Sequence, residues 1–136
     1  MCYNVPMQSE MTKEQVNMLS TDALAYLGDA YFTLVCRLRV LQAHNTKPAK
    51  LHPTVTNLVN AHAQSEFLEK IATLLNKEES DIVRRARNSP TTTKSKHYGL
   101  AEYKRATSFE ALIGFLYLTD KQRLEVVLNE VFKGDV

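Results

Sequence analysis

Apolar residues in the first part of the chain recur at spacings of three and four, the pattern of one face of a helix. The six members of this stripe between residues 22 and 42 are Leu24, Leu27, Tyr31, Leu34, Leu38 and Leu41. Residues 23–36 are apolar on almost every side, which is typical of a helix buried all round. The single acid of this segment, Asp29, directly follows Gly28 and lies opposite the stripe.

A second apolar segment, residues 106–118, repeats this design. Its only acid is Glu110, and Gly114 follows four residues later on the same helical face. Glycines allow two helices to approach closely, and an isolated buried carboxylate needs a strong partner. We therefore predict that residues 22–42 and about 100–118 form two packed helices whose acids meet at a divalent cation.

The remaining apolar and polar positions predict shorter helices. We expect helices at residues 53–59, 60–75 and 77–87, with Pro53, Asn60 and Asn76 at or near their starts. A last amphipathic helix follows Asp120 and ends at Gly134. Residues 44–50 and 89–96 are expected to be connections, and Pro6 argues against a helix in the polar lead-in, residues 1–18. Because no segment alternates with period two, the pattern predicts an all-α fold.

Composition narrows the class of protein without identifying it. A chain of 136 residues is expected to form one domain. Two cysteines are too few for a disulfide framework and fit the reducing cytoplasm. The N-terminus lacks the pattern of a signal peptide, and no apolar window reaches membrane-spanning length, so no membrane partner is expected.

Positive charge is concentrated between residues 84 and 105, although the net charge of the chain is only +2. This basic segment holds one acid, Glu102, and seven cations: Arg84, Arg85, Arg87, Lys94, Lys96, Lys104 and Arg105. Lysine and arginine neutralise backbone phosphates, so a basic segment beside an acidic metal site suits a phosphodiester substrate. The plainer alternative is a solvated helix end, where cations are also favoured.

Two motifs carry a resemblance to a known family. L-A-Y-L-G-D-A (residues 24–30) and F-E-A-L-I-G (residues 109–114) resemble the signature helices of the ribonuclease III catalytic domain. The Mini-ribonuclease III branch, which has no double-stranded-RNA-binding domain, is the closest match. Further stretches that resemble this branch are residues 46–52, 84–88 and 103–114.

The resemblance implies an all-α homodimer with one acidic site in each protomer, the two sites cutting opposite strands of an RNA duplex. It implies that Asp29 and Glu110 are the catalytic acids and hold Mg²⁺, with Mn²⁺ as a substitute. It places the catalytic domain at residues 19–134. It also implies double-stranded precursor RNA of the large (23S) ribosomal subunit as substrate, with a ribosomal protein as a candidate partner.

The chain departs from full-length ribonuclease III at two positions. Ala25 and Thr107 stand where that type has further metal-site acids, and the resemblance implies that the Mini branch lacks both acids as well. Asp22 matches another acidic position of the full-length family and is either a helix cap or an outer acid of the site. The alternative to a nuclease is a catalytically weak or inactive module that binds structured RNA or ribosomal particles.

A third interpretation is a helical scaffold. In it the two acids are paired with basic residues, for which Lys104, Arg105 and Arg37 are the candidates. The four histidines show no zinc-binding spacing, so no zinc site is expected.

Overall fold

The computed structural model describes residues 11–90 and 99–134, and within these ranges the chain contains helices and no strand. The elements in chain order are α1 (Lys13–Asn17), α2 (Thr21–Ala43), α3 (Pro48–Val59), α4 (Ala61–Ile71), the 3₁₀ turn η1 (Ala72–Leu74), α5 (Lys77–Asn88), α6 (Leu100–Thr119) and α7 (Lys121–Val131). The prediction of an all-α fold is confirmed. None of the described helices has the length and apolar character needed to cross a membrane.

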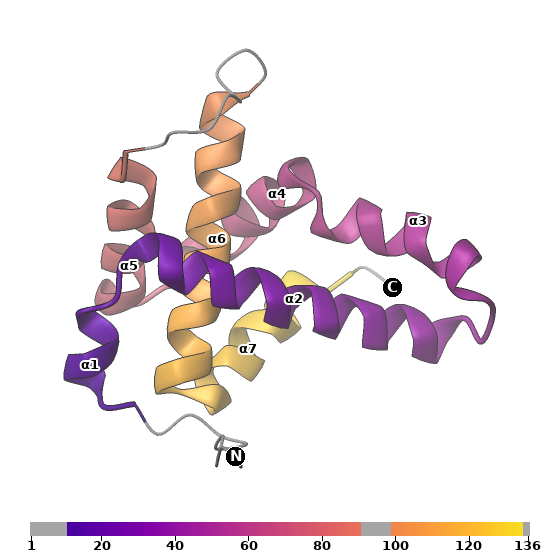
Figure 1. Ribbon diagram of the computed structural model, residues 1–136, viewed down its shortest axis with the longest axis horizontal. Helices are drawn as coiled ribbons and strands as arrows, with labels where there is room; N and C mark the ends of the chain where they lie inside the picture. The colour runs from indigo at the N-terminus through magenta and orange to yellow at the C-terminus, as the bar shows by residue number, and fades with distance from the viewer. Residues whose placement is uncertain (1–10, 91–98, 135–136) are drawn as a thin grey trace, which may run out of the picture.

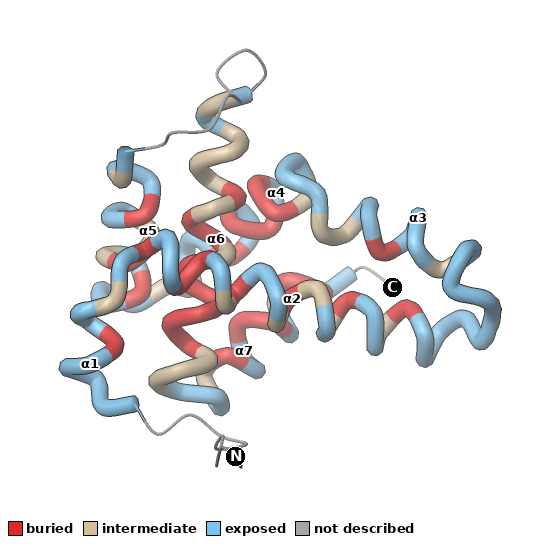
Figure 2. The backbone as a smooth tube through the Cα atoms, in the orientation of Figure 1, coloured by how far each residue is buried: buried red, intermediate tan, exposed pale blue. Residues whose placement is uncertain are grey.

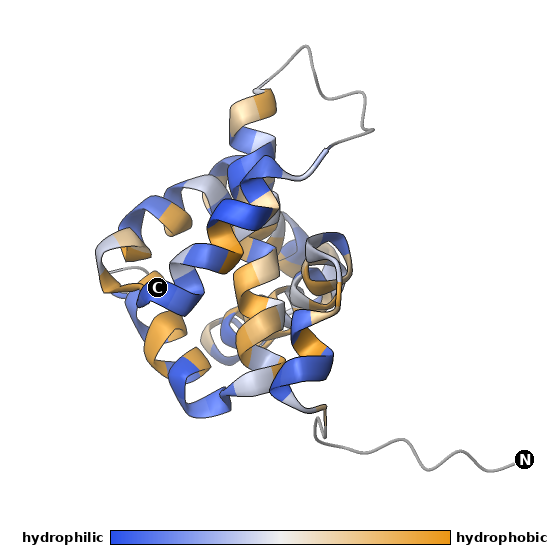
Figure 3. Ribbon diagram, turned by 90° about the vertical axis from the view of Figure 1, so that its left-hand side faces the viewer, coloured by the Kyte–Doolittle hydropathy of each residue, from blue (hydrophilic) through white to orange (hydrophobic). Residues whose placement is uncertain are grey.

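Helix α6 is the centre of the bundle. It packs against α2, α4 and α5, and its contact with α2 is the most extensive in the molecule (Figure 1). Every residue between 111 and 116 is buried, so the apolar half of α6 supplies much of the core (Figure 2). In Figure 3 most of α5 is hydrophilic, whereas the C-terminal half of α6 is hydrophobic. The central position of α6 follows from its C-terminal half having almost no polar face.

Four phenylalanines join the helices around α6. Phe32 of α2 lies edge-on to Phe109 of α6, with ring centroids 5.0 Å apart, and stacks on Phe132 after α7 at 5.9 Å. Phe67 of α4 contacts all three rings. Offset and edge-on aromatic pairs contribute about 0.5–1.5 kcal/mol each beyond their area burial. This cluster fixes α2, α4 and α7 on α6.

Several helix boundaries differ from those predicted. Helix α1 was not expected; it forms because Thr12 and Gln15 make a reciprocal capping box. Helix α3 starts at Pro48 rather than Pro53, since Pro48 suits the first turn and Pro53 is accommodated inside the helix. The predicted helix 60–75 ends as an α-helix at Ile71 and closes in the 3₁₀ turn.

The prediction that residues 23–36 form a helix buried on all sides was also wrong. The C-terminal half of α2 runs beyond α6 and forms an arm with α3 (Figure 1). Along this arm Leu34, Leu38 and Leu41 of the predicted inward stripe are about half exposed, at 53%, 49% and 49%. Tyr26, earlier on α2, is 84% exposed. A helix is buried on all sides only where other helices surround it. The C-terminal half of α2 extends beyond α6 and packs against α3.

Candidate active site

The site is built on a close crossing of α2 and α6. A Cβ added to Gly28 would lie 1.8 Å from the main-chain oxygen of Glu110, and one added to Gly114 would lie 2.0 Å from that of Leu24. The two backbones therefore touch, which only glycine permits. The prediction that these glycines let the two helices pack closely is confirmed. The crossing places Asp29, one residue after Gly28, next to Glu110.

The two carboxyl groups differ in exposure. Asp29 is exposed and Glu110 is partly buried, so the prediction that both acids are buried was wrong for Asp29. Burial, a hydrogen bond with Asp29 and the negative charge of Asp29 together raise the pKa of Glu110 to about 8. Two acids this close disfavour each other's ionised form unless a cation lies between them.

A third polar group reaches Glu110 from α4. The Nε2 amide of Gln64 donates a hydrogen bond to Oε2 of Glu110 over 3.3 Å. Gln64 is 2% exposed, and its hydrogen bond acts against the rise in the pKa of Glu110. The sequence reasoning missed this residue, although it precedes the buried Leu68 by four and so lies on the inward face of α4.

Asp29 and Glu110 open into a cavity of about 360 Å³ between α2, α5 and α6. Asp22, Tyr103 and Lys104 line the same cavity. Asp22 is not the cap of α2, because Ser20 accepts the hydrogen bond from the Ala23 amide. The structure therefore brings Asp22 to the acidic site, and Lys104 is the one basic residue of the predicted set that lines it among those that the structure describes.

Ala25 and Thr107, the two positions for which the resemblance implies further acids in full-length ribonuclease III, line this cavity too. The hydroxyl of Thr107 donates to the carbonyl of Tyr103 at 3.0 Å and so is held by its own helix. No group of three or more metal-binding side chains lies together among the residues that the structure describes. Any cation here has two close carboxylates, and other oxygens must complete its shell.

The other predicted RNA-binding residues are dispersed. Arg84, Arg85 and Arg87 lie exposed on α5, Arg84 3.6 Å from Asp81. Arg105 points at α4 instead, where its Nε donates to Oγ of Ser65 over 2.6 Å. Lys94 and Lys96 fall outside the residues that the structure describes.

The scaffold interpretation receives little support from these contacts. Arg105 donates to Ser65, and Arg37 lines a groove between α2 and α3 that contains neither acid. The side chain seen to donate to Glu110 is the neutral amide of Gln64.

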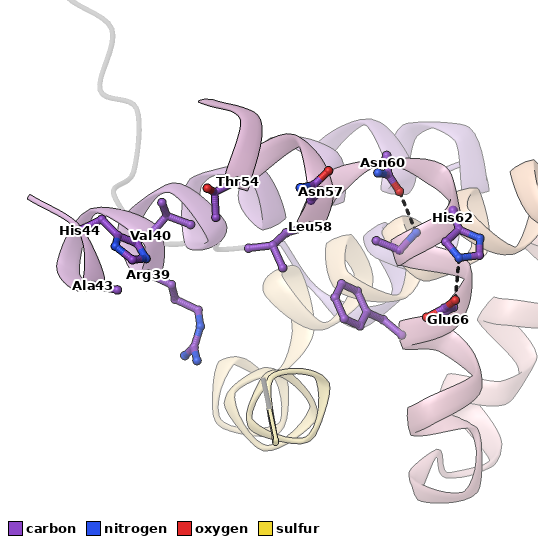
Figure 4. A pocket seen from close by; sticks show the side chains of 12 residues that line it. Arg39, Val40, Ala43, His44, Thr54, Asn57, Leu58, Asn60, His62 and Glu66 are labelled. Atoms are coloured by element: carbon purple, nitrogen blue, oxygen red, sulfur yellow. Dashed lines mark hydrogen bonds and ion pairs between the residues drawn. The ribbon is translucent and has the colours of Figure 1, made fainter. Parts of the chain in front are cut away.

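A second cavity, of about 490 Å³, lies between α2, α3 and α4 and contains neither Asp29 nor Glu110 (Figure 4). At its edge Nε2 of His62 is 2.6 Å from Glu66, and its Nδ1 is 2.9 Å from Glu102. The hydrogen bond with Glu102 and the charges of both acids raise the pKa of His62. This histidine therefore ties α4 to the first turn of α6.

Comparison with known proteins agrees with this geometry. The family model of the Ribonuclease III domain matches residues 22–121. The chain therefore belongs to the ribonuclease III domain family, and this membership implies a ribonuclease.

Its relatives within the family are Mini-ribonuclease 3 proteins. The chain is 41% identical over 120 residues to that of Thermoanaerobacter sp. (strain X514), covering 88% of this chain and 84% of the relative. It is 36% identical over 124 residues to that of Clostridium tetani, covering 90% and 82%. A solved structure from Fusobacterium nucleatum superposes with a TM-score of 0.75 at 39% identity, covering 85% of this chain and 89% of that one. The resemblance to the Mini branch is confirmed.

Proposed function

We propose that this protein is a Mg²⁺-dependent endoribonuclease that cleaves double-stranded RNA. The observation that carries the proposal is the pair of carboxyl groups, Asp29 and Glu110, held together at the glycine crossing in an open cavity. Adjacent carboxylates in a cavity lined by Lys104 suit a cation and a phosphate at once. The substrate we propose is precursor RNA of the large ribosomal subunit, in the cytoplasm, with a ribosomal protein as a candidate partner.

The residues present fit a magnesium ion. Mg²⁺ prefers oxygen ligands and is held by one or two carboxylates, with waters and substrate phosphates completing its shell. Asp29 and Glu110 would supply the two carboxylates, and Asp22 would act as an outer acid. When bound, the cation supplies Lewis acidity towards the phosphate and lowers the pKa of water. Mn²⁺, which also accepts oxygen ligands, is expected to substitute.

The basic residues would hold the substrate. Lys104 lines the acidic cavity and is placed to neutralise a phosphate beside the two acids. The rest of the proposed RNA-binding set is Arg84, Arg85, Arg87, Lys94 and Lys96, whereas Arg105 is directed to Ser65. Contacts of this kind to phosphates carry little sequence information and make binding strongly dependent on salt. Duplex RNA is recognised mostly by its shape and its 2′-hydroxyl groups.

We also propose that the catalytic unit, residues 19–134, acts as a homodimer. Support comes from the exposed apolar side chains at positions 26, 34, 38 and 41, which follow one face of α2. An exposed apolar face of this kind marks a protein contact. Tyr26 both belongs to this face and lines the acidic cavity, so the interface would adjoin the site. Leu38→Glu should then give monomers in sedimentation velocity; dimers in that variant would place the interface elsewhere.

Cleavage of end-labelled duplex RNA tests the proposal. Wild-type protein with Mg²⁺ should cut both strands, whereas Asp29→Asn and Glu110→Gln should retain the duplex without cutting it. Glu69→Gln, at an exposed acid of α4, is the matched control and should cut at the wild-type rate. Wild-type cutting by either site variant, or cutting that needs no divalent cation, would refute the assignment.

A module that binds structured RNA without cutting it is the second candidate. The observation in its favour is that Ala25 and Thr107 leave the cavity with fewer acids than full-length ribonuclease III. Retention of the duplex in a shift assay, with no product from wild-type protein at any concentration of Mg²⁺ or Mn²⁺, would favour this candidate.

A further inference from the structure

We infer that Gln64 is a positioning residue that holds the Glu110 carboxylate in the orientation needed for cation binding. The inference deepens the proposed function and rests on it. Gln64 belongs to α4, a helix that contributes no residue to the lining of the acidic cavity. Its effect on the reaction would therefore pass through Glu110 and not through contact with RNA.

The contact is specific and shielded from water. Gln64 is 2% exposed, and its amide lies 3.3 Å from Oε2 of Glu110. Asp29 on α2 meets the same carboxyl group. Glu110 is thus contacted from two different helices, and each contact restricts its rotamers. A buried amide without a partner is unfavourable, so the hydrogen bond also restricts Gln64 itself.

The chemistry of an amide suits this position. An amide N–H stabilises an ionised carboxylate as acceptor without adding a positive charge that would compete with the cation. A carboxylate at position 64 would add a like charge, and an aliphatic side chain would leave Glu110 without its donor. The hydroxyl of Thr107 is held by Tyr103, and the amide that donates to Glu110 is that of Gln64.

The small number of acids makes orientation important. Ala25 and Thr107 contribute no carboxylate, so the two remaining acids carry the direct protein ligation of a cation. Loss of one correctly oriented ligand oxygen should then weaken binding more than in a site with four acids. Residues that orient metal ligands typically contribute about 10–100-fold to metal affinity or activity.

Gln64→Met removes the amide while keeping an unbranched side chain of similar size. Ile71→Val is the matched control, because it loosens the same buried face of α4 two turns along the helix from Gln64. Binding of Mn²⁺ without RNA is measured from the electron paramagnetic resonance signal of the free ion. We expect Gln64→Met to weaken Mn²⁺ binding about 10–100-fold. The control should match the wild type.

Kinetics on duplex RNA provide a second measurement. Gln64→Met should lower kcat at a fixed, limiting concentration of Mg²⁺ and leave KM for RNA within about twofold, and raising Mg²⁺ should restore kcat. A merely structural role would instead lower the melting temperature and affect the variant and the Ile71→Val control alike.

The outcomes separate this inference from the proposed function. Wild-type protein that binds Mn²⁺ and cuts RNA, beside a Gln64→Met variant with unchanged Mn²⁺ affinity and kcat, overturns the role of Gln64 alone. Wild-type protein that neither binds Mn²⁺ nor cuts RNA overturns the proposed function, and the inference with it. A loss of Mn²⁺ affinity in Gln64→Met, with the control unchanged, supports both.

Discussion

The crossing at Gly28 offers a direct test of how the site is built. A methyl group at this position would lie 1.8 Å from the main-chain oxygen of Glu110, whereas ordinary van der Waals contact begins at 3.4 Å. The obstacle is backbone, which cannot rotate aside as the end of a flexible side chain can. Gly28→Ala must therefore push α2 and α6 apart at the point where Asp29 meets Glu110.

Two terms set the size of the effect on stability. Overpacking costs about 1–3 kcal/mol, and more where the neighbours cannot move. Alanine regains about 1 kcal/mol over glycine through its higher helix propensity. Because the methyl group would enter so far inside the contact limit, we expect an overpacking cost of about 3–4 kcal/mol, above the usual range. After the helix-propensity gain of about 1 kcal/mol, Gly28→Ala should lower the free energy of unfolding by about 2–3 kcal/mol.

The effect on cleavage should be larger than the effect on stability suggests. Displacing a catalytic group by about 1 Å can lower a rate about 100-fold. The separation of the helices would displace the two acids from each other by a similar distance. Urea unfolding followed by circular dichroism gives the stability, and cleavage of duplex RNA is measured at a temperature where the variant remains folded.

Two further variants act as controls. A Cβ added to Gly134 meets nothing within 4 Å, so Gly134→Ala should cost only about 1–2 kcal/mol for its left-handed backbone and leave cleavage unchanged. Gly114→Ala should resemble Gly28→Ala, and the double variant should lose less stability than the sum, since one separation relieves both contacts. A Gly28→Ala protein with wild-type stability and a wild-type rate of RNA cleavage would show that α2 and α6 do not touch at Gly28.

Three other changes have consequences that depend on pH. Burial, the hydrogen bond and the charge of the neighbouring acid raise the pKa of Glu110 to about 8 from 4.5, so the native state loses stability as pH rises between these values. Glu110→Gln removes this loss and should be more stable than the wild type at pH 9, by about 1–3 kcal/mol after allowance for solvent screening. Burial opposes ionisation of Glu79, but hydrogen bonding by Arg123 at 2.8 Å lowers its pKa below 4.5. Arg123→Leu should therefore cost about 3 kcal/mol above pH 5 and progressively less as pH falls through that lowered pKa. The hydrogen bond to Glu102 raises the pKa of His62, so this pair stabilises the fold below about pH 6.5 and the contribution is lost as pH rises through the raised pKa. His62→Ala should thus lower stability slightly at pH 6 and have no effect at pH 9.

Urea unfolding at several pH values measures all three changes. An effect of Glu110→Gln that does not vary between pH 5 and pH 9 would show that Glu110 ionises normally. A loss for Arg123→Leu that does not diminish as pH is lowered into the acid range in which Glu79 becomes protonated would show that the ion pair does not stabilise the fold. A greater loss for His62→Ala at pH 9 than at pH 6 would contradict the sign derived for that pair.

Local sequence signals were sufficient for the centre of the fold. The two acids and their glycines lie on helices whose apolar character is plain from the sequence, and Asn76 and Asp120 cap helices where expected. These features depend on residues close together along one helix, so periodicity and capping reveal them.

Features that depend on where each neighbouring helix ends could not be predicted in this way. Leu38 is exposed because α2 extends beyond α6, and the spacing of apolar residues along α2 does not reveal where α6 ends. Arg105 was grouped with the other cations by charge alone, yet its Nε turns to Ser65 on α4. Gln64 and Glu110 are 46 residues apart in the sequence, and only the fold brings their side chains together.

The contacts that form the site and those that stabilise the fold are largely separate. Glu110 faces Asp29 at a crossing that offers no favourable charge partner among its described protein contacts, and its raised pKa is the sign of this unfavourable arrangement. The phenylalanine cluster lies on other faces of the same helices. The ion pair between buried Glu79 and partly buried Arg123 lies at the C-terminal end of α6. A bundle with this second set of contacts can tolerate two adjacent acids until a cation neutralises them. It follows that Gly28→Ala, which moves whole helices, must lower stability and cleavage together, whereas Gln64→Met should separate the two.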